Sequence, residues 1–217
     1  MKVILASSGL ANEEIIDRLE GFVGKSRKNI NVVIINEAIK GEAGDHRWFA
    51  EELQRICSVI GGRIEFVDLQ AHDEDHILKR INEADMIFCF GGNTDYLANV
   101  FTKTGFDKIL PKILQEKVWV GSSAGSCVLC NKESIETQSA VYKEKCGFDH
   151  YMNIIPIVFL PHLHGWFKFD KPEIIKASEA TVLPVYALSD NAAIAYDGTN
   201  FDVLGNDYII AQEGKIS

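Results

Sequence analysis

The stretch that decides the fold is Val118-Trp119-Val120-Gly121-Ser122-Ser123-Ala124-Gly125-Ser126-Cys127-Val128-Leu129. It begins with an apolar run, passes through a turn of small residues with the pattern G-x-S-x-G, and continues into a segment that reads as helical. A strand that enters a helix through this pattern is a nucleophile elbow, in which the serine sits on a sharp, exposed turn. Gly121 and Gly125 leave room where the strand and the helix approach each other. The stretch therefore makes Ser123 a candidate nucleophile.

The same alternation of short apolar runs and amphipathic segments extends upstream of the elbow. Five apolar runs predict strands, at residues 2–6, 31–35, 63–69, 85–90 and 118–121. Amphipathic segments at residues 13–19 and 46–60 predict helices between them. Continuously apolar strands separated by helices are typical of a parallel sheet that helices cover on both faces. We therefore expect an α/β fold with a doubly wound, mostly parallel sheet flanked by helices.

After residue 130 the pattern changes to short strand-like runs separated by turns. The runs lie at residues 153–160, 185–188, 192–196, 201–204 and 208–211. Asp197-Gly198-Thr199-Asn200 and Gly205-Asn206-Asp207 are turn sequences between the last of them. We expect a C-terminal antiparallel β-meander that completes one edge of the sheet. Because no linker, repeat or low-complexity segment interrupts the chain, residues 1–217 are expected to form a single domain.

The composition argues against several classes of partner. The chain has 217 residues, of which 47% are hydrophobic, and a formal net charge of −9 without any run rich in Lys and Arg. This charge balance disfavours nucleic acid and anionic membranes as partners. No secretory signal and no membrane span are expected from the apolar stretches. Five cysteines scattered through apolar segments indicate reduced thiols, and so a cytoplasmic protein.

Ser123 also has a plainer interpretation, because Ser122 or Ser123 could simply cap the helix that follows. A catalytic serine needs a base, and the base needs a group that orients it. His162 and His164 directly follow the apolar run 153–160, so either could be that base, although a strand-end histidine can also bond only to backbone. Asp190 follows the run 185–188 and could orient the base or form a turn.

A second glycine-rich turn, Gly91-Gly92-Asn93-Thr94, follows the run 85–90. Its backbone N–H groups could face an oxyanion beside the N–H of Ala124. Asn93 or Thr94 could equally cap a following helix, and the two interpretations are compatible. The turn lacks the third glycine and the downstream acid of a dinucleotide-binding fingerprint, and no Walker lysine is present.

Taken together, these motifs resemble the peptidase E family, the S51 serine peptidases, which include aspartyl dipeptidases and cyanophycinases. Four segments carry the resemblance in order and spacing: Phe90-Gly91-Gly92-Asn93-Thr94, Gly121-Ser122-Ser123-Ala124-Gly125, Pro161-His162 and Leu188-Ser189-Asp190-Asn191. The resemblance covers most of the chain. It implies a fold like that of the class I glutamine amidotransferases, with serine in place of cysteine at the elbow.

Carried over residue by residue, the resemblance implies that Ser123 is the nucleophile, His162 the base and Asp190 the third member of a triad. It also implies that the backbone N–H groups of Gly92 and Ala124 form the oxyanion hole. No metal and no organic cofactor is required by this chemistry. His164 stays an alternative to His162 as the base.

The stretch after His162 departs from the family pattern. Aspartyl dipeptidases of this family hold the acidic side chain of the substrate with basic residues there, arginine prominently. This chain has Gly165-Trp166-Phe167-Lys168-Phe169-Asp170-Lys171-Pro172 instead, and no arginine follows Arg80. Lysine binds a carboxylate as a point charge, without the bidentate geometry of arginine. The three aromatic residues indicate either an apolar or mixed pocket or a packed surface loop. The candidate substrate-binding residues are Asn93, Thr94, His164, Trp166 and Lys168.

We therefore expect a serine peptidase that hydrolyses short peptides through an acyl-enzyme on Ser123, with specificity for aspartyl dipeptides left open by the missing arginines. A serine esterase or amidase with the same triad is one alternative, and a catalytically inactive, amidotransferase-like binding module is another. The expected partner is a short peptide or another small amide, and the expected assembly is a monomer or a homodimer.

Overall fold

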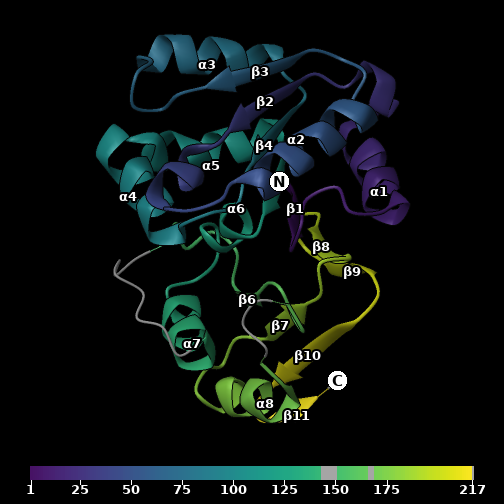
Figure 1. Ribbon diagram of the computed structural model, residues 1–217, viewed down its shortest axis with the longest axis vertical. Helices are drawn as coiled ribbons and strands as arrows, with labels where there is room; N and C mark the ends of the chain where they lie inside the picture. Colours follow the sequence, from purple (N-terminus) through teal and green to yellow (C-terminus); the bar gives the residue numbers. More distant parts are fainter. Residues whose placement is uncertain (143–150, 166–168, 217) are drawn as a thin grey trace.

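A computed structural model describes residues 1–142, 151–165 and 169–216 (Figure 1). Its larger sheet has seven strands, which are β1 (Lys2–Ala6), β2 (Val32–Ile35), β3 (Ile64–Val67), β4 (Met86–Cys89), β5 (Val118–Ser122), β8 (Ala192–Tyr196) and β9 (Phe201–Gly205). They lie side by side in the order β3-β2-β4-β5-β1-β8-β9. The first five strands run parallel, whereas β8 and β9 run antiparallel at one edge. The predicted mostly parallel sheet is confirmed.

Helices cover both faces of this central sheet. They are α1 (Glu13–Val23), α2 (Arg47–Val59), α3 (Glu74–Glu83), α4 (Thr94–Thr104) and α5 (Phe106–Glu116), with the short 3-10 turns η1 (Arg27–Asn29) and η2 (Glu37–Gly41). Alternate residues of each strand point to opposite faces. Ile4 and Val120 therefore share a core with α1 and α2, while Leu5 and Trp119 share a core with α3, α4 and α5. None of the described helices is both long and apolar enough to cross a bilayer.

A second, smaller sheet lies beside the central one and is drawn below it in Figure 1. Its strands are β6 (Val158–Leu160), β7 (Val185–Leu188), β10 (Tyr208–Gln212) and β11 (Lys215–Ile216), in the order β11-β10-β7-β6. Two helices, α7 (Glu133–Tyr142) and α8 (Lys171–Glu179), pack on this sheet, which has a core of its own. The pair β6 and β7 is parallel, and the other neighbours are antiparallel.

The antiparallel C-terminal strands are therefore present, but they are divided between the two sheets. Only β8 and β9 complete the edge of the central sheet, beside β1. The chain turns at Ser189-Asp190-Asn191, so that β7 and β8 are consecutive in sequence and belong to different sheets. An apolar run predicts a buried strand but does not determine which strand it pairs with, because strand pairing depends on packing between distant segments.

The run predicted as a strand at residues 153–160 is shortened to β6. Asn153 has a φ of 57°, which breaks the extended conformation. The N–H groups of Ile154 and Ile155 instead donate to the carbonyl of Leu129, at 2.9 Å each. This early part of the run therefore packs against the segment that follows the elbow, and only β6 joins the second sheet.

Candidate active site

The elbow forms as the sequence predicts. The strand β5 ends at Ser122, and the helix α6 (Ala124–Cys127) begins immediately after Ser123. Ser123 has φ 47° and ψ −109°, a backbone conformation that a non-glycine residue adopts only under constraint from its surroundings. Its N–H donates to the carbonyl of Ala6 at 3.0 Å. A Cβ on Gly125 would overlap the carbonyl of Cys89, so the turn requires glycine at that position.

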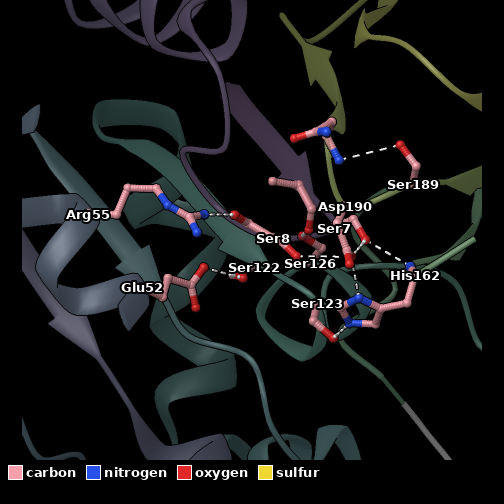
Figure 2. Close-up of polar contacts among 12 residues, drawn as sticks. Ser7, Ser8, Glu52, Arg55, Ser122, Ser123, Ser126, His162, Ser189 and Asp190 are labelled. Carbon is pink, nitrogen blue, oxygen red and sulfur yellow. Dashed lines mark hydrogen bonds and ion pairs between the residues drawn. The ribbon is translucent and has the colours of Figure 1, made fainter. Parts of the chain in front are cut away.

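His162 lies just beyond the end of β6, with Nε2 2.9 Å from Ser123 Oγ (Figure 2). Its own backbone is in the left-handed region, with φ 64°. The N–H of His162 donates to Ser7 Oγ at 2.8 Å, and its carbonyl accepts from the N–H of Gly165 at 2.8 Å. These bonds hold the imidazole between the two sheets, beside the elbow.

Asp190 lies just beyond the end of β7, and its Oδ1 is 2.6 Å from His162 Nδ1. The same oxygen accepts from the hydroxyls of Ser7, at 3.2 Å, and Ser8, at 3.0 Å. The hydrogen bond with His162 is the main cause that lowers the pKa of Asp190 below its usual value, and the two serine hydroxyls act in the same direction. An ionised Asp190 only accepts, so Nδ1 of His162 carries a proton and Nε2 is left to accept from Ser123.

The turn after β4 faces the elbow from the neighbouring strand. Cys89 pairs with Gly121 in the parallel register, so β4 and β5 end side by side. Gly92 has φ 128°, and a Cβ there would lie 2.6 Å from the carbonyl carbon and oxygen of Ala38. Over the described ranges, the N–H groups of Gly92 and Ala124 donate to no backbone carbonyl. Neither N–H group is therefore taken up by a backbone acceptor among the described residues.

The other sequence candidates lie apart from this centre. Asn93 caps α4, and its side chain accepts from the N–H of Tyr96 at 2.7 Å. Thr94 is the first residue of that helix. His164 is exposed, and its Nε2 lies 3.5 Å from Asp207 Oδ1. None of these three lines the cavity at Ser123. Trp166 and Lys168 fall outside the described residues.

A cavity of about 310 Å³ opens at Ser123, His162 and Asp190. One of its walls comes from α2, whose residues in the cavity follow a spacing of three and four along one helical face: Trp48, Glu51, Glu52 and Arg55. Glu42, which follows η2, also lines the cavity. The sequence interpretation did not include this wall. The sequence signal that could have indicated this wall is the set of charged residues directly beside the apolar stripe of the helix predicted at residues 46–60.

Ser7, Ser8 and Ser122 were also missed as parts of the site. Ser7 and Ser8 follow the end of β1, at the same edge of the sheet as the elbow. The carboxyl ends of neighbouring parallel strands are where α/β proteins place their ligands, so this position was a usable signal. In the part of the chain that the structure describes, no group of three or more His, Cys, Asp or Glu residues could hold a metal ion.

Comparisons with known proteins agree on one family. The model of peptidase family S51 matches residues 3–204. An uncharacterized peptidase from Listeria monocytogenes is 26% identical over 155 residues, which are 70% of this chain and 75% of the relative. An uncharacterized peptidase from Pasteurella multocida is 22% identical over 95% of this chain and 99% of the relative.

Solved structures share the fold. A Listeria monocytogenes protein described as a candidate peptidase E has a TM-score of 0.71 and 23% identity, covering 95% of this chain and 98% of its own. A peptidase from an acI-B1 actinobacterium has a TM-score of 0.67 and 17% identity, covering 100% of this chain and 92% of its own. Because the family match spans nearly the whole sequence, including all four motifs, this chain belongs to peptidase family S51.

Proposed function

We propose that this chain is a serine peptidase that cleaves short peptides through an acyl-enzyme on Ser123. The observation that carries the proposal is the continuous run of contacts from Ser123 Oγ to His162 Nε2, at 2.9 Å, and from His162 Nδ1 to Asp190 Oδ1, at 2.6 Å. Hydroxyl, imidazole and carboxylate in this order are the parts of a serine nucleophile with its base and orienting acid. Membership of a peptidase family supports amide hydrolysis as the reaction.

In the proposed reaction, Nε2 of His162 removes the hydroxyl proton of Ser123 while Oγ attacks the carbonyl carbon of the scissile amide. The N–H groups of Gly92 and Ala124 stabilise the oxyanion that forms. The imidazolium then gives its proton to the leaving nitrogen, the C–N bond breaks, and the acyl group remains on Ser123. A water molecule, deprotonated by the same imidazole, attacks this ester and releases the acid, and the proton returns to Ser123.

Asp190 stays ionised through this cycle. Its pKa is lowered chiefly by the hydrogen bond with His162, so the carboxylate is charged at neutral pH. It keeps Nδ1 protonated, orients the ring and stabilises the imidazolium, which is the part that the acid of a triad performs.

The cavity suits a short peptide, because its volume of about 310 Å³ is at the small end of ligand pockets. Besides the buried Glu52 and the proposed triad, the charged residues that line the cavity are Glu42, Glu51 and Arg55. The acidic side chain of an Asp-X dipeptide would be placed in a cavity whose walls already carry carboxyl groups. We therefore expect Asp-X dipeptides to be cleaved no faster than Ala-X dipeptides, which a dipeptide panel measures.

A fluorophosphonate probe tests the proposed nucleophile. The native chain should be labelled, and Ser123→Ala should lose labelling and peptide hydrolysis by at least about 10³-fold. Ser58→Ala is the matched control, since Ser58 is an exposed serine of α2 whose hydroxyl, within the described residues, bonds only to the carbonyl of Arg55 in its own helix. A native chain that is never labelled at any pH would favour the inactive binding module. Labelling with cleavage of esters but not of peptides would instead favour the esterase.

A further inference from the structure

Glu52 is a buried carboxyl that the proposed reaction does not use. It lies on α2, its residue is 7% exposed, and it forms part of the cavity wall. Within the described ranges, no Lys, Arg or His nitrogen lies within 4.0 Å of its carboxyl. Burial raises the pKa of Glu52, and the hydrogen bond from Ser122 and the more distant charges of Arg55 and His162 only partly oppose this. Burial disfavours the charged form of such a carboxyl.

Among the described residues, Glu52 has one hydrogen-bond partner, Ser122, which immediately precedes the proposed nucleophile. The hydroxyl of Ser122 donates to Glu52 Oε1 at 2.6 Å, and both residues are buried. The second oxygen of Glu52 points away from Ser122 in Figure 2. Either a carboxylate oxygen or the carbonyl oxygen of a neutral acid can accept this bond, so the contact does not depend on the charge of Glu52.

The loop after β1 leaves room for this carboxyl. Gly9 has φ +60°, and a Cβ there would overlap Glu52 Oε1 and lie 2.9 Å from Phe88 Cζ. A residue larger than glycine at this position would displace the carboxyl from Ser122. Contact between Glu52 and Ser122 thus depends on three segments, which are α2, β5 and the loop that also carries Ser7 and Ser8.

Ser122 is the link between this contact and the elbow. The backbone after Ser123 is held by α6, where the N–H groups of Ser126 and Cys127 donate to the carbonyl of Ser123 at 2.9 Å each. Before Ser123, strand pairing holds the main chain, with Ser122 opposite Ala6. The side chain of Ser122 has Glu52 as its partner. A strained residue such as Ser123 keeps its conformation only when the residues on both sides of it are fixed.

We propose that Glu52 is a positioning residue: its carboxyl anchors Ser122 and thereby fixes the turn that aims Ser123 Oγ at His162. The inference rests on the proposed function, because it concerns the same nucleophile. It assigns Glu52 no contact with the reacting atoms. Its effect is on how often Oγ is correctly placed, and therefore on the rate of acylation rather than on binding.

The test measures the limiting rate, kinact, and the half-saturation concentration, KI, for a fluorophosphonate. Glu52→Leu and Ser122→Ala should each lower kinact about tenfold with KI unchanged, since tenfold corresponds to about 1.4 kcal/mol, which is within the range of one lost hydrogen bond. The double variant should be no slower than the slower single variant, because both changes break one contact. Glu52→Gln, a neutral group of the same shape, should restore most of the rate. The control is Gln54→Leu, an exposed position of the same helix outside the cavity.

The outcomes separate this inference from the proposed function. If the native chain is labelled and both Glu52→Leu and Ser122→Ala react at the native rate, the inference is wrong and the nucleophile stands. A loss confined to a higher KI would make Glu52 a substrate contact, which also contradicts it. Glu52→Gln as slow as Glu52→Leu would also contradict the inference, because the amide oxygen keeps an acceptor for Ser122. If Glu52→Leu does not fold, as judged by its melting curve, Ser122→Ala decides alone. An unlabelled native chain removes the proposed function, and the inference with it.

Discussion

The central sheet and the second sheet contribute different kinds of groups to the site. Ser123, Gly92 and Ser7 follow the ends of β5, β4 and β1 in the central sheet, whereas His162 and Asp190 follow β6 and β7 in the second sheet. The central sheet therefore carries the proposed nucleophile and backbone donors, and the second sheet carries the proposed base and acid. The proposed chemistry therefore depends on how the two sheets pack against each other, in addition to the conformation of the turns that follow their strands.

The two regions also hold their strained residues differently. Ser123 is constrained within its own sheet, through the N–H bond to Ala6 and the close approach of Gly125 to Cys89. His162 is constrained across the sheets, because its N–H donates to Ser7 Oγ. Ser7 is itself buried and also donates to Asp190. The position of Ser123 is thus set locally by the elbow, while the position of His162 depends on the neighbouring sheet.

Removing the base from the second sheet should have the largest effect. His162→Ala is expected to lower peptide hydrolysis and fluorophosphonate labelling by at least about 10³-fold, because nothing is left to accept the Ser123 proton. His164→Ala should stay within about twofold of the native rate, since His164 lies beside Asp207 and outside the cavity. The reverse order of effects would make His164 the base.

Neutralising the acid of the second sheet should have a smaller effect. Asp190→Asn is expected to reduce turnover by about 10²- to 10⁴-fold, because an amide can leave His162 in the wrong tautomer. Asp207→Asn is the matched control, at an exposed carboxyl that lies beside His164. Equal activity of Asp190→Asn and the native chain would remove Asp190 from the triad.

The stability of the native chain and that of Asp190→Asn should depend differently on pH. The pKa of Asp190 is lower in the folded chain than the value of 3.8 expected when it is unfolded. Its charge therefore stabilises the fold above about pH 4, and this contribution is lost as the pH falls through the lower, folded pKa. The difference in melting temperature between the native chain and Asp190→Asn should shrink on acidification, as calorimetry can measure.

Breaking the hydrogen bonds of Ser7 to the second sheet should have a smaller effect on activity than His162→Ala or Asp190→Asn. Ser7→Ala removes a donor to Asp190 and the acceptor for the N–H of His162. The side chains of His162 and Asp190 themselves are unchanged. We expect a loss of about three- to tenfold in acylation rate, about the size of one hydrogen bond, because Asp190 keeps its bonds with Ser8 and His162. Ser8→Ala, which removes only a bond to Asp190, should cost less. A Ser7→Ala variant as fast as the native chain would mean that packing alone positions the base.

The sequence predicted the parts of the fold that depend on local pattern. The five parallel strands, the elbow and the glycine-rich turn after β4 follow from apolar runs and from residues that permit tight turns. The order of four motifs predicted the family, which the comparisons confirm. Of the predicted substrate-binding residues, Asn93, Thr94 and His164 lie outside the cavity, because a position near a motif does not determine where a side chain points.

The sequence by itself thus determined that Ser123 follows a buried strand at a glycine-flanked turn, since backbone strain and close packing there require those residue types. Only the tertiary structure decided that β7 leaves the central sheet, that His162 rather than His164 reaches Ser123, and that one face of α2 forms the wall of the cavity. These features arise from contacts between segments far apart in the chain. Such contacts depend on how two sheets and a helix pack together, and no short stretch of sequence specifies that arrangement.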